Sequence, residues 1–162
     1  MATQPCVCGY LGDPRRSCTC DPGEVLRYRS RISGPLRDRI DLHLSVGTVP
    51  FRELQDTGPS ESSACVRGRV VAARERQAAR AATLGVTALW NAGLGQRELR
   101  LWCRPDPTGA SLLEDASDRL GLSARGVHRV LKVGRTIADL EGRECLEEDH
   151  LAEALQCRSA EP

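Results

Sequence analysis

Two pairs of cysteines near the N-terminus constrain the fold of this chain more than any other feature. One residue separates the members of each pair, and nine residues lie between the pairs, which are Cys6 and Cys8, then Cys18 and Cys20. Four thiolates are enough for a tetrahedral structural zinc site, and Gly9 and Gly12 give the intervening loop freedom to fold back. The spacing differs from the commoner C-x₂-C pairs, so a reduced thiol cluster ordered only by packing stays as the alternative.

The absence of membrane and export signals sets the expected compartment. No apolar run approaches the length of a membrane span, and the N-terminus lacks the apolar stretch of a signal peptide. We therefore expect a cytoplasmic protein with no membrane partner, whose cysteines are reduced or bound to metal. The remaining cysteines stand alone in helix-like contexts and are expected to be small buried hydrophobes; they are Cys65, Cys103, Cys145 and Cys157.

Composition favours helices. Aromatic residues make up only 3% of the 162 residues, so the core must be built from Leu, Val, Ile and Ala. Such a core favours helices over a β-sandwich or a β-barrel. The net charge is +1, which excludes a global field that attracts nucleic acid. Lys132 is the only lysine. Arginine supplies every other Lys/Arg position, which is typical of a GC-rich genome. A preference for arginine in bidentate phosphate contacts has to be argued site by site.

The patterns of apolar residues and helix breakers predict a mainly α fold. Short helices are expected over Gly23–Ser30 and from Pro35, and alternation of apolar and polar residues predicts a half-buried strand over Ile40–Val46. Beyond the turn-rich segment Thr57–Ser63 the pattern is helical, with helices at Glu61–Leu84, Gln96–Cys103, Ser111–Leu120, Ala124–Leu140 and Glu147–Cys157. Gly134 is expected to allow a close contact between helices.

Long motifs in this sequence resemble a known family. The segments that carry the resemblance are Cys6–Cys20, Tyr28–His43, Ser123–Gly142 and His150–Leu155. They closely resemble the magnesium-chelatase-like AAA+ ATPases of the ComM/YifB group, over nearly the whole chain but only the family's C-terminal third. The resemblance implies a helical lid bundle over 57–162, preceded over 1–56 by a small, incomplete α/β remnant of the ATPase core that carries the Cys-rich loop.

The resemblance also implies a function. It points to an ATP-driven ring protein, often hexameric, that acts on DNA, and in ComM-type members to branch migration during recombination. The partners it implies are further copies in a homo-hexamer, an intact AAA+ relative, and DNA. A stand-alone zinc-bearing interaction module is the alternative from another class. Chelation of magnesium into a tetrapyrrole ranks last, because the C-x-C pairs belong to the ComM-like group.

Three residues match nucleotide-site positions of the family. Arg39 matches the arginine finger, which a planar, permanently charged guanidinium suits; the alternative is a surface pair with Asp38 or Asp41. Arg125 matches the sensor 2 arginine, in a first helical turn where a cation opposes the helix dipole by about 0.3–1 kcal/mol. Gln4 stands where the family has the Asn of sensor 1 and keeps its amide on a longer arm.

Two ATPase motifs are missing from the sequence. It contains no G-x-x-x-x-G-K-[ST] and no apolar strand that ends in paired acidic residues. ATP and magnesium are therefore expected only with an intact phosphate-loop half or partner, and the chain alone is expected not to hydrolyse ATP. Because Met1 falls inside a strand that the resemblance implies, we expect the chain to start within a domain; a truncated gene or a misplaced start codon would explain this, and a natural short protein is the alternative.

The long helix predicted over Glu61–Leu84 is locally basic. Five arginines dominate its charge; they are Arg67, Arg69, Arg74, Arg76 and Arg80. Such a helix could follow a phosphate backbone, but it has no aromatic residue that would stack on bases. A solvated helix surface is the favoured interpretation.

Overall fold

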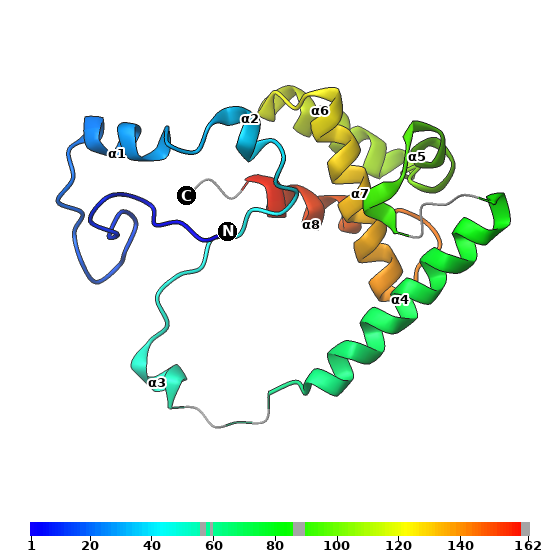
Figure 1. Cartoon of the computed structure of the whole chain (residues 1–162), viewed down its shortest axis with the longest axis horizontal. Helices are drawn as coiled ribbons and strands as arrows, with labels where there is room; N and C mark the ends of the chain where they lie inside the picture. The colour runs from blue at the N-terminus through cyan, green and yellow to red at the C-terminus, as the bar shows by residue number, and fades with distance from the viewer. Residues whose placement is uncertain (56–57, 59, 86–89, 160–162) are drawn as a thin grey trace. The chain divides into compact units, whose positions relative to one another are not determined.

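The structure of this chain is a computed structural model, which describes residues 1–55, 58, 60–85 and 90–159. It is mainly helical, as the sequence predicts. The chain divides into two compact units, Met1–Gly58 and Pro59–Ser159, called unit 1 and unit 2 below. Residues 56–57 and 59, in the segment predicted to separate two domains, lie outside the described residues. Figure 1 shows the helices of both units.

Unit 1 holds three short helices, α1 (Pro22–Arg29), α2 (Gly34–Arg37) and α3 (Phe51–Leu54). The first two were predicted to within a residue, and α3 was not predicted. Asp21 begins α1 with a capping box, because its carboxylate accepts from the Glu24 N–H while the Glu24 carboxylate accepts from the Asp21 N–H. Cys6 is the single buried residue among the described residues of this unit.

The strand predicted over Ile40–Val46 is wrong. This segment is irregular, and its apolar residues Leu42, Leu44 and Val46 are exposed. A strand exists only when its N–H and C=O groups pair with a neighbouring strand. Within the described residues there is no strand to offer such pairing, only an isolated bridge between Pro105 and Leu146. The alternation alone therefore does not make this segment a strand.

Unit 2 is a helical bundle whose elements agree with the predicted helices except at their ends. They are α4 (Ser63–Leu84), the 3₁₀ turn η1 (Asn91–Gly93), α5 (Gln96–Trp102), α6 (Pro107–Leu120), α7 (Ala124–Glu141) and α8 (Glu148–Ser159). The helix α6 starts four residues before the predicted Ser111, because the Asp106 carboxylate accepts from the Gly109 N–H and Pro107 fits the first turn. Glycines in the left-handed region end α4, α6 and α7.

The core of unit 2 surrounds α7, which packs against α8, α4, α5 and η1 (Figure 1). Its buried apolar residues include Leu99, Leu113, Val130, Ala138, Leu146 and Leu151. The close approach predicted at Gly134 is confirmed. A Cβ at Gly134 would lie 3.1 Å from Leu151 Cδ2 and 3.2 Å from Leu146 Cδ1, so any larger residue there would require these two side chains to shift by a few tenths of an ångström.

The isolated cysteines do not share one environment. Cys103 is buried in the core as predicted, but Cys65 and Cys145 are exposed, so the prediction of burial is wrong for these two. Cys65 lies in the first turn of α4, where α4 extends away from the other helices of unit 2 (Figure 1). Among the described residues, every helix is too short or too polar to cross a membrane.

Candidate functional site

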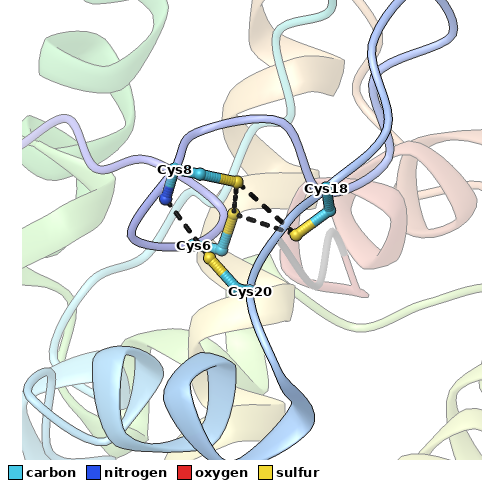
Figure 2. Close-up of side chains that lie close together, drawn as sticks. All are labelled: Cys6, Cys8, Cys18 and Cys20. Atoms are coloured by element: carbon cyan, nitrogen blue, oxygen red, sulfur yellow. Dashed lines mark hydrogen bonds between the residues drawn. The ribbon is translucent and has the colours of Figure 1, made fainter.

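The structure brings the four N-terminal cysteines together, with their sulfur atoms facing one another (Figure 2). The Sγ atoms of Cys6 and Cys8 are 3.4 Å apart, and the Cys18 Sγ lies 3.7 Å from Cys6 Sγ and 3.5 Å from Cys8 Sγ. The Cys20 Sγ completes a group whose four atoms all lie within 4.8 Å of one another. A tetrahedral zinc with Zn–S bonds of about 2.3 Å would place its sulfurs about 3.8 Å apart, so the four side chains fit a bound metal ion.

The loop between the two pairs is shaped by local turns. Gly9 and Gly12 adopt φ values of +84° and +81°, which glycine reaches without steric cost. The Gly9 N–H donates to the Cys6 carbonyl at 3.2 Å and closes the first turn. The Asp13 carboxylate then accepts from the N–H groups of Arg15 and Arg16. These turns reverse the chain within ten residues and return Cys18 to the first pair.

Such close sulfurs lose their protons in steps rather than independently. Backbone N–H groups of Tyr10 and Thr19 favour the thiolate and lower the pKa of Cys8 to about 5. The Cys8 N–H favours the Cys20 thiolate, but burial and the three neighbouring sulfurs outweigh it and raise the pKa of Cys20 to about 12. A cation among the sulfurs would favour the thiolate form of all four, which is the form that binds metal.

The cluster is attached to α1 at both ends of that helix. Cys20 directly precedes Asp21, the capping residue of α1, and the Cys8 N–H donates to the Cys20 Sγ at 3.4 Å. At the other end of α1, the Arg29 Nε donates to the Pro5 carbonyl at 3.4 Å, one residue before Cys6. Contacts at both ends of α1 therefore connect this helix to the cysteine loop.

The two other predicted site residues of unit 1 lie close to these elements in the chain. Gln4 is exposed, and its Oε1 would lie 3.6 Å from a Cβ at Gly9, so its side chain faces the cysteine loop. Arg39 is exposed in the turn after α2, where its N–H donates to the Leu36 carbonyl at 3.0 Å. Arg125 belongs to unit 2, so the structure places the predicted nucleotide-site residues in two separate units.

Arg125 stands in the first turn of α7 at the edge of a pocket. Ser123 caps this helix by accepting from the Gly126 N–H at 3.1 Å, and Arg125 is exposed beside it. The pocket has a volume of about 340 Å³. Its lining combines basic, polar and apolar side chains, namely Leu94, Gln96, Leu99, Ala124, Arg125, His128, Arg129 and Lys132. Arg125 at the helix N-terminus, with Arg129 and Lys132 further along the same helix, makes this pocket basic and suited to an anion.

Lys132 also has a structural contact that the sequence did not predict. Its Nζ donates to the Ala92 carbonyl of η1 at 2.9 Å. This bond fixes the side chain against η1 at the pocket wall.

Unit 2 contains a buried ionic network that the sequence did not predict. The Asp139 carboxylate is fully buried and forms an ion pair with Arg80 of α4. It also accepts from the Arg135 Nε at 3.1 Å and from the Asn91 Nδ2 at 2.8 Å. Burial lowers the pKa of Arg135, and the Asp139 charge opposes that shift. Arg135 lies four residues before Asp139 on α7, a spacing equally typical of exposed pairs, so the sequence carries no signal of burial.

The basic face of α4 is largely occupied by contacts within the chain. The Arg76 Nη1 donates to the Asp139 carbonyl at 3.0 Å, and Arg80 pairs with the Asp139 side chain. Arg69 pairs with Glu61 at 2.7 Å, and the Arg74 guanidinium lies 4.9 Å from the centre of the Trp90 ring. Most of the arginines that could follow a phosphate backbone are therefore already engaged in contacts within the chain.

The fold and the sites define the class of this chain: a mainly helical protein with a basic pocket on its C-terminal bundle and a four-cysteine cluster near its N-terminus. Residues 60–158 match the family model described as magnesium chelatase, subunit ChlI C-terminal, and residues 1–54 match the model for magnesium chelatase, subunit ChlI. The chain therefore belongs to the magnesium chelatase subunit ChlI family, and is of the ComM/YifB type.

Three relatives illustrate this similarity. The chain is 42% identical over 151 residues to competence protein ComM of Haemophilus influenzae and, over the same length, to the uncharacterised protein YifB of Escherichia coli. Each match covers 93% of this chain and 28% of the relative. An uncharacterised protein of Mycobacterium tuberculosis is 37% identical over 158 residues, covering 98% of this chain and 30% of that protein. The chain thus spans less than a third of the length of these relatives.

Proposed function

We propose that this chain supplies the lid and the arginine finger of a magnesium-chelatase-like AAA+ ATPase, and that the whole ATPase acts on DNA. The observation that carries this proposal is the basic pocket at the N-terminus of α7. Arg125 lies there with Arg129 and Lys132, and the volume of about 340 Å³ is in the range of small-ligand sites. Helix N–H groups and guanidinium groups together suit the phosphates of a nucleotide.

Arg39 is proposed to act on a nucleotide held by a neighbouring subunit of a ring, such as a homo-hexamer or an assembly with an intact relative. Its exposure in the turn after α2 leaves the side chain accessible to a partner. A guanidinium reaching the transferred phosphate stabilises charge that builds up only in the transition state. Gln4 is proposed to orient the attacking water through its amide.

DNA as the substrate rests on the family resemblance and agrees with the word competence in the printed name of the Haemophilus relative. Branch migration is the activity proposed for the whole protein. In this role the present chain contributes to hydrolysis and subunit contact. The phosphate loop and magnesium ligands come from a matching half of the ATPase.

Zinc is the metal proposed for the cluster of Cys6, Cys8, Cys18 and Cys20. A set of four thiolates is typical of structural zinc, which supplies folding energy rather than reactivity. The sulfur separations support this assignment.

The ATPase proposal can be tested by joining this sequence behind the phosphate-loop half of the Haemophilus relative. Arg39→Ala is expected to reduce ATP hydrolysis on the order of 10³-fold while ATP binding stays nearly unchanged, because a finger acts in the transition state. Arg125→Ala is expected to weaken both binding and hydrolysis. Arg37→Ala and Arg119→Ala, which remove exposed arginines outside the proposed site, serve as matched controls.

A mixing experiment tests the position of Arg39 at a subunit boundary. Rings that combine the Arg39→Ala protein with a phosphate-loop mutant should recover part of the activity, because each supplies what the other lacks. If no activity returns although subunit exchange is demonstrated, the role of Arg39 across the boundary is refuted. Equal effects of Arg125→Ala and Arg119→Ala on ATP binding would refute the lid role.

A stand-alone zinc-bearing interaction module is the second candidate. The observation that favours it is that all four sulfurs come from residues 6–20, so the cluster needs no residue of unit 2. This function predicts binding of the separate chain to an intact relative that depends on the cysteines and is unaffected by Arg125→Ala.

A further inference from the structure

Unit 1 lacks the apolar core that normally holds a folded unit together. Among its described residues only Cys6 is buried. Its large apolar side chains face solvent, with Leu26, Leu44 and Phe51 exposed at 69%, 72% and 68%. Units of this size that bury so little apolar surface usually depend on disulfides or a metal. The single buried side chain is one of the four candidate metal ligands.

The contacts that shape unit 1 converge on the cysteine cluster. Cys18 and Cys20 are brought back to Cys6 and Cys8 across the turn-rich loop (Figure 2). The N-terminus of α1 follows Cys20 directly, and the Arg29 side chain ties its C-terminus to the Pro5 carbonyl.

The same contacts continue toward Arg39. The Ile32 N–H donates to the Arg29 carbonyl at 3.2 Å, and α2 begins two residues later. Arg39 follows α2 in the next turn. The path from the cluster to Arg39 therefore runs through one short helix and successive turns, with no buried apolar contact along it.

Contacts among the four sulfurs without a metal are too weak to order such a segment, whereas binding of a metal to thiolates releases free energy that appears as folding free energy. We propose that a thiophilic divalent cation, held by Cys6, Cys8, Cys18 and Cys20, is what folds unit 1, and that its removal disorders the segment from the cysteine loop to Arg39 while unit 2 stays folded. Unit 2 keeps its structure because its own core lies around α7. The proposal needs only the metal assignment and is independent of the ATPase role.

The chain carries natural probes for the two units. Its two tyrosines, Tyr10 and Tyr28, belong to unit 1, and its two tryptophans, Trp90 and Trp102, belong to unit 2. Zinc-loaded full-length chain should be compared with chain treated with a strong zinc chelator, using amide hydrogen exchange read by mass spectrometry from the first seconds. We expect amides of residues 21–39 to exchange at least tenfold faster without zinc, and those of α7 and α8 to stay unchanged.

Tyrosine and tryptophan fluorescence, recorded before and after zinc is added back to the chelated chain, provides a second measurement. Tyrosine emission should change on chelation and return when one equivalent of zinc is added, while tryptophan emission stays constant. The double variant Cys18→Ser, Cys20→Ser should bind no zinc and show the fast exchange of the chelated chain. The double variant Cys65→Ser, Cys145→Ser is the matched control, because it removes two exposed cysteines of unit 2; it should bind one zinc and keep slow exchange.

Three results would overturn the inference. Unchanged exchange at residues 21–39 after chelation would show that unit 1 folds without metal. Loss of protection in α7 and α8 along with unit 1 would show that the metal stabilises the whole chain. Absence of bound zinc in the unmodified chain, with unit 1 nonetheless protected, would remove the metal from the fold. None of these measurements depends on ATP hydrolysis. Failure of the proposed ATPase role would therefore leave their result unchanged.

Discussion

Asp139→Ala is expected to be the most destabilising single change in unit 2. The carboxylate is fully buried, pairs with Arg80, and accepts hydrogen bonds from Arg135 and Asn91. The Arg135 side chain is itself only 1% exposed. Truncation leaves this guanidinium buried without its counter-charge, beside a second one from α4. The guanidinium hydrogen bonds to the Arg143 and Glu144 carbonyls stay, but neither carbonyl carries a net charge.

The size of the effect follows from that uncompensated charge. Removing one partner of a buried ion pair costs about 3–5 kcal/mol in the free energy of unfolding. Because domains of this size are stable by about 5–15 kcal/mol, the variant loses roughly a fifth or more of its stability. With a urea m-value of about 2 kcal/mol/M, the unfolding midpoint should fall by about 2 M.

Urea unfolding followed by tryptophan fluorescence is the suitable assay, because Trp90 and Trp102 both report on unit 2. Glu61→Ala is the matched control. It removes the partner of Arg69 in a pair whose side chains are 42% and 55% exposed, and such pairs contribute at most about 1 kcal/mol. If Asp139→Ala costs no more than Glu61→Ala, the buried network does not stabilise unit 2 and the reasoning fails.

Three further predictions concern unit 2, two of them in the core around α7 and one in α4. Burial raises the pKa of the Cys103 thiol from 9.0 to about 11, so its contribution to unfolding free energy is complete below pH 9 and is lost as pH rises toward 11. Urea melts at pH 8 to 11 should show this decline in the unmodified chain and a smaller one in Cys103→Ala; equal declines would contradict it. Gly134→Ala should destabilise unit 2 by about 1–3 kcal/mol, because the added methyl presses on Leu146 and Leu151. Gly68→Ala, where the added Cβ meets nothing within 4 Å, should instead stabilise α4 by about 0.5–1 kcal/mol, and the same sign for both variants would contradict the packing argument.

Helices and the cysteine cluster could be predicted because their signals are local. Capping residues such as Asp106 and Ser123 determine where a helix begins from hydrogen bonds within three residues. The gathering of Cys6, Cys8, Cys18 and Cys20 needs only two glycine turns between the pairs. The start of α6 was predicted four residues too late, although its signal is also local: Asp106 is the capping residue and Pro107 fits the first turn.

Features that depend on a distant partner could not be predicted. The alternation over Ile40–Val46 describes a strand only when another strand lies beside it, and the described residues provide none. Asp139 is buried because Arg80, 59 positions away in the sequence, approaches it from α4. Nothing in the spacing of α4 distinguishes Arg80 from Arg67, although one pairs with a buried carboxylate and the other is exposed.

The positions of the arginines support the proposal that Arg125 has a function outside the fold. Arg80 and Arg135 neutralise Asp139, Arg76 caps a backbone carbonyl, and each of these contacts explains why the residue is charged. Arg125 is exposed in the first turn of α7, where the helix dipole makes a cation unfavourable by about 0.3–1 kcal/mol. Arg129 and Lys132 line the same pocket and add repulsion between like charges. A phosphate bound in this pocket would offset both terms, since the helix N-terminus attracts it beside Arg125 and the three basic side chains attract it from the pocket lining.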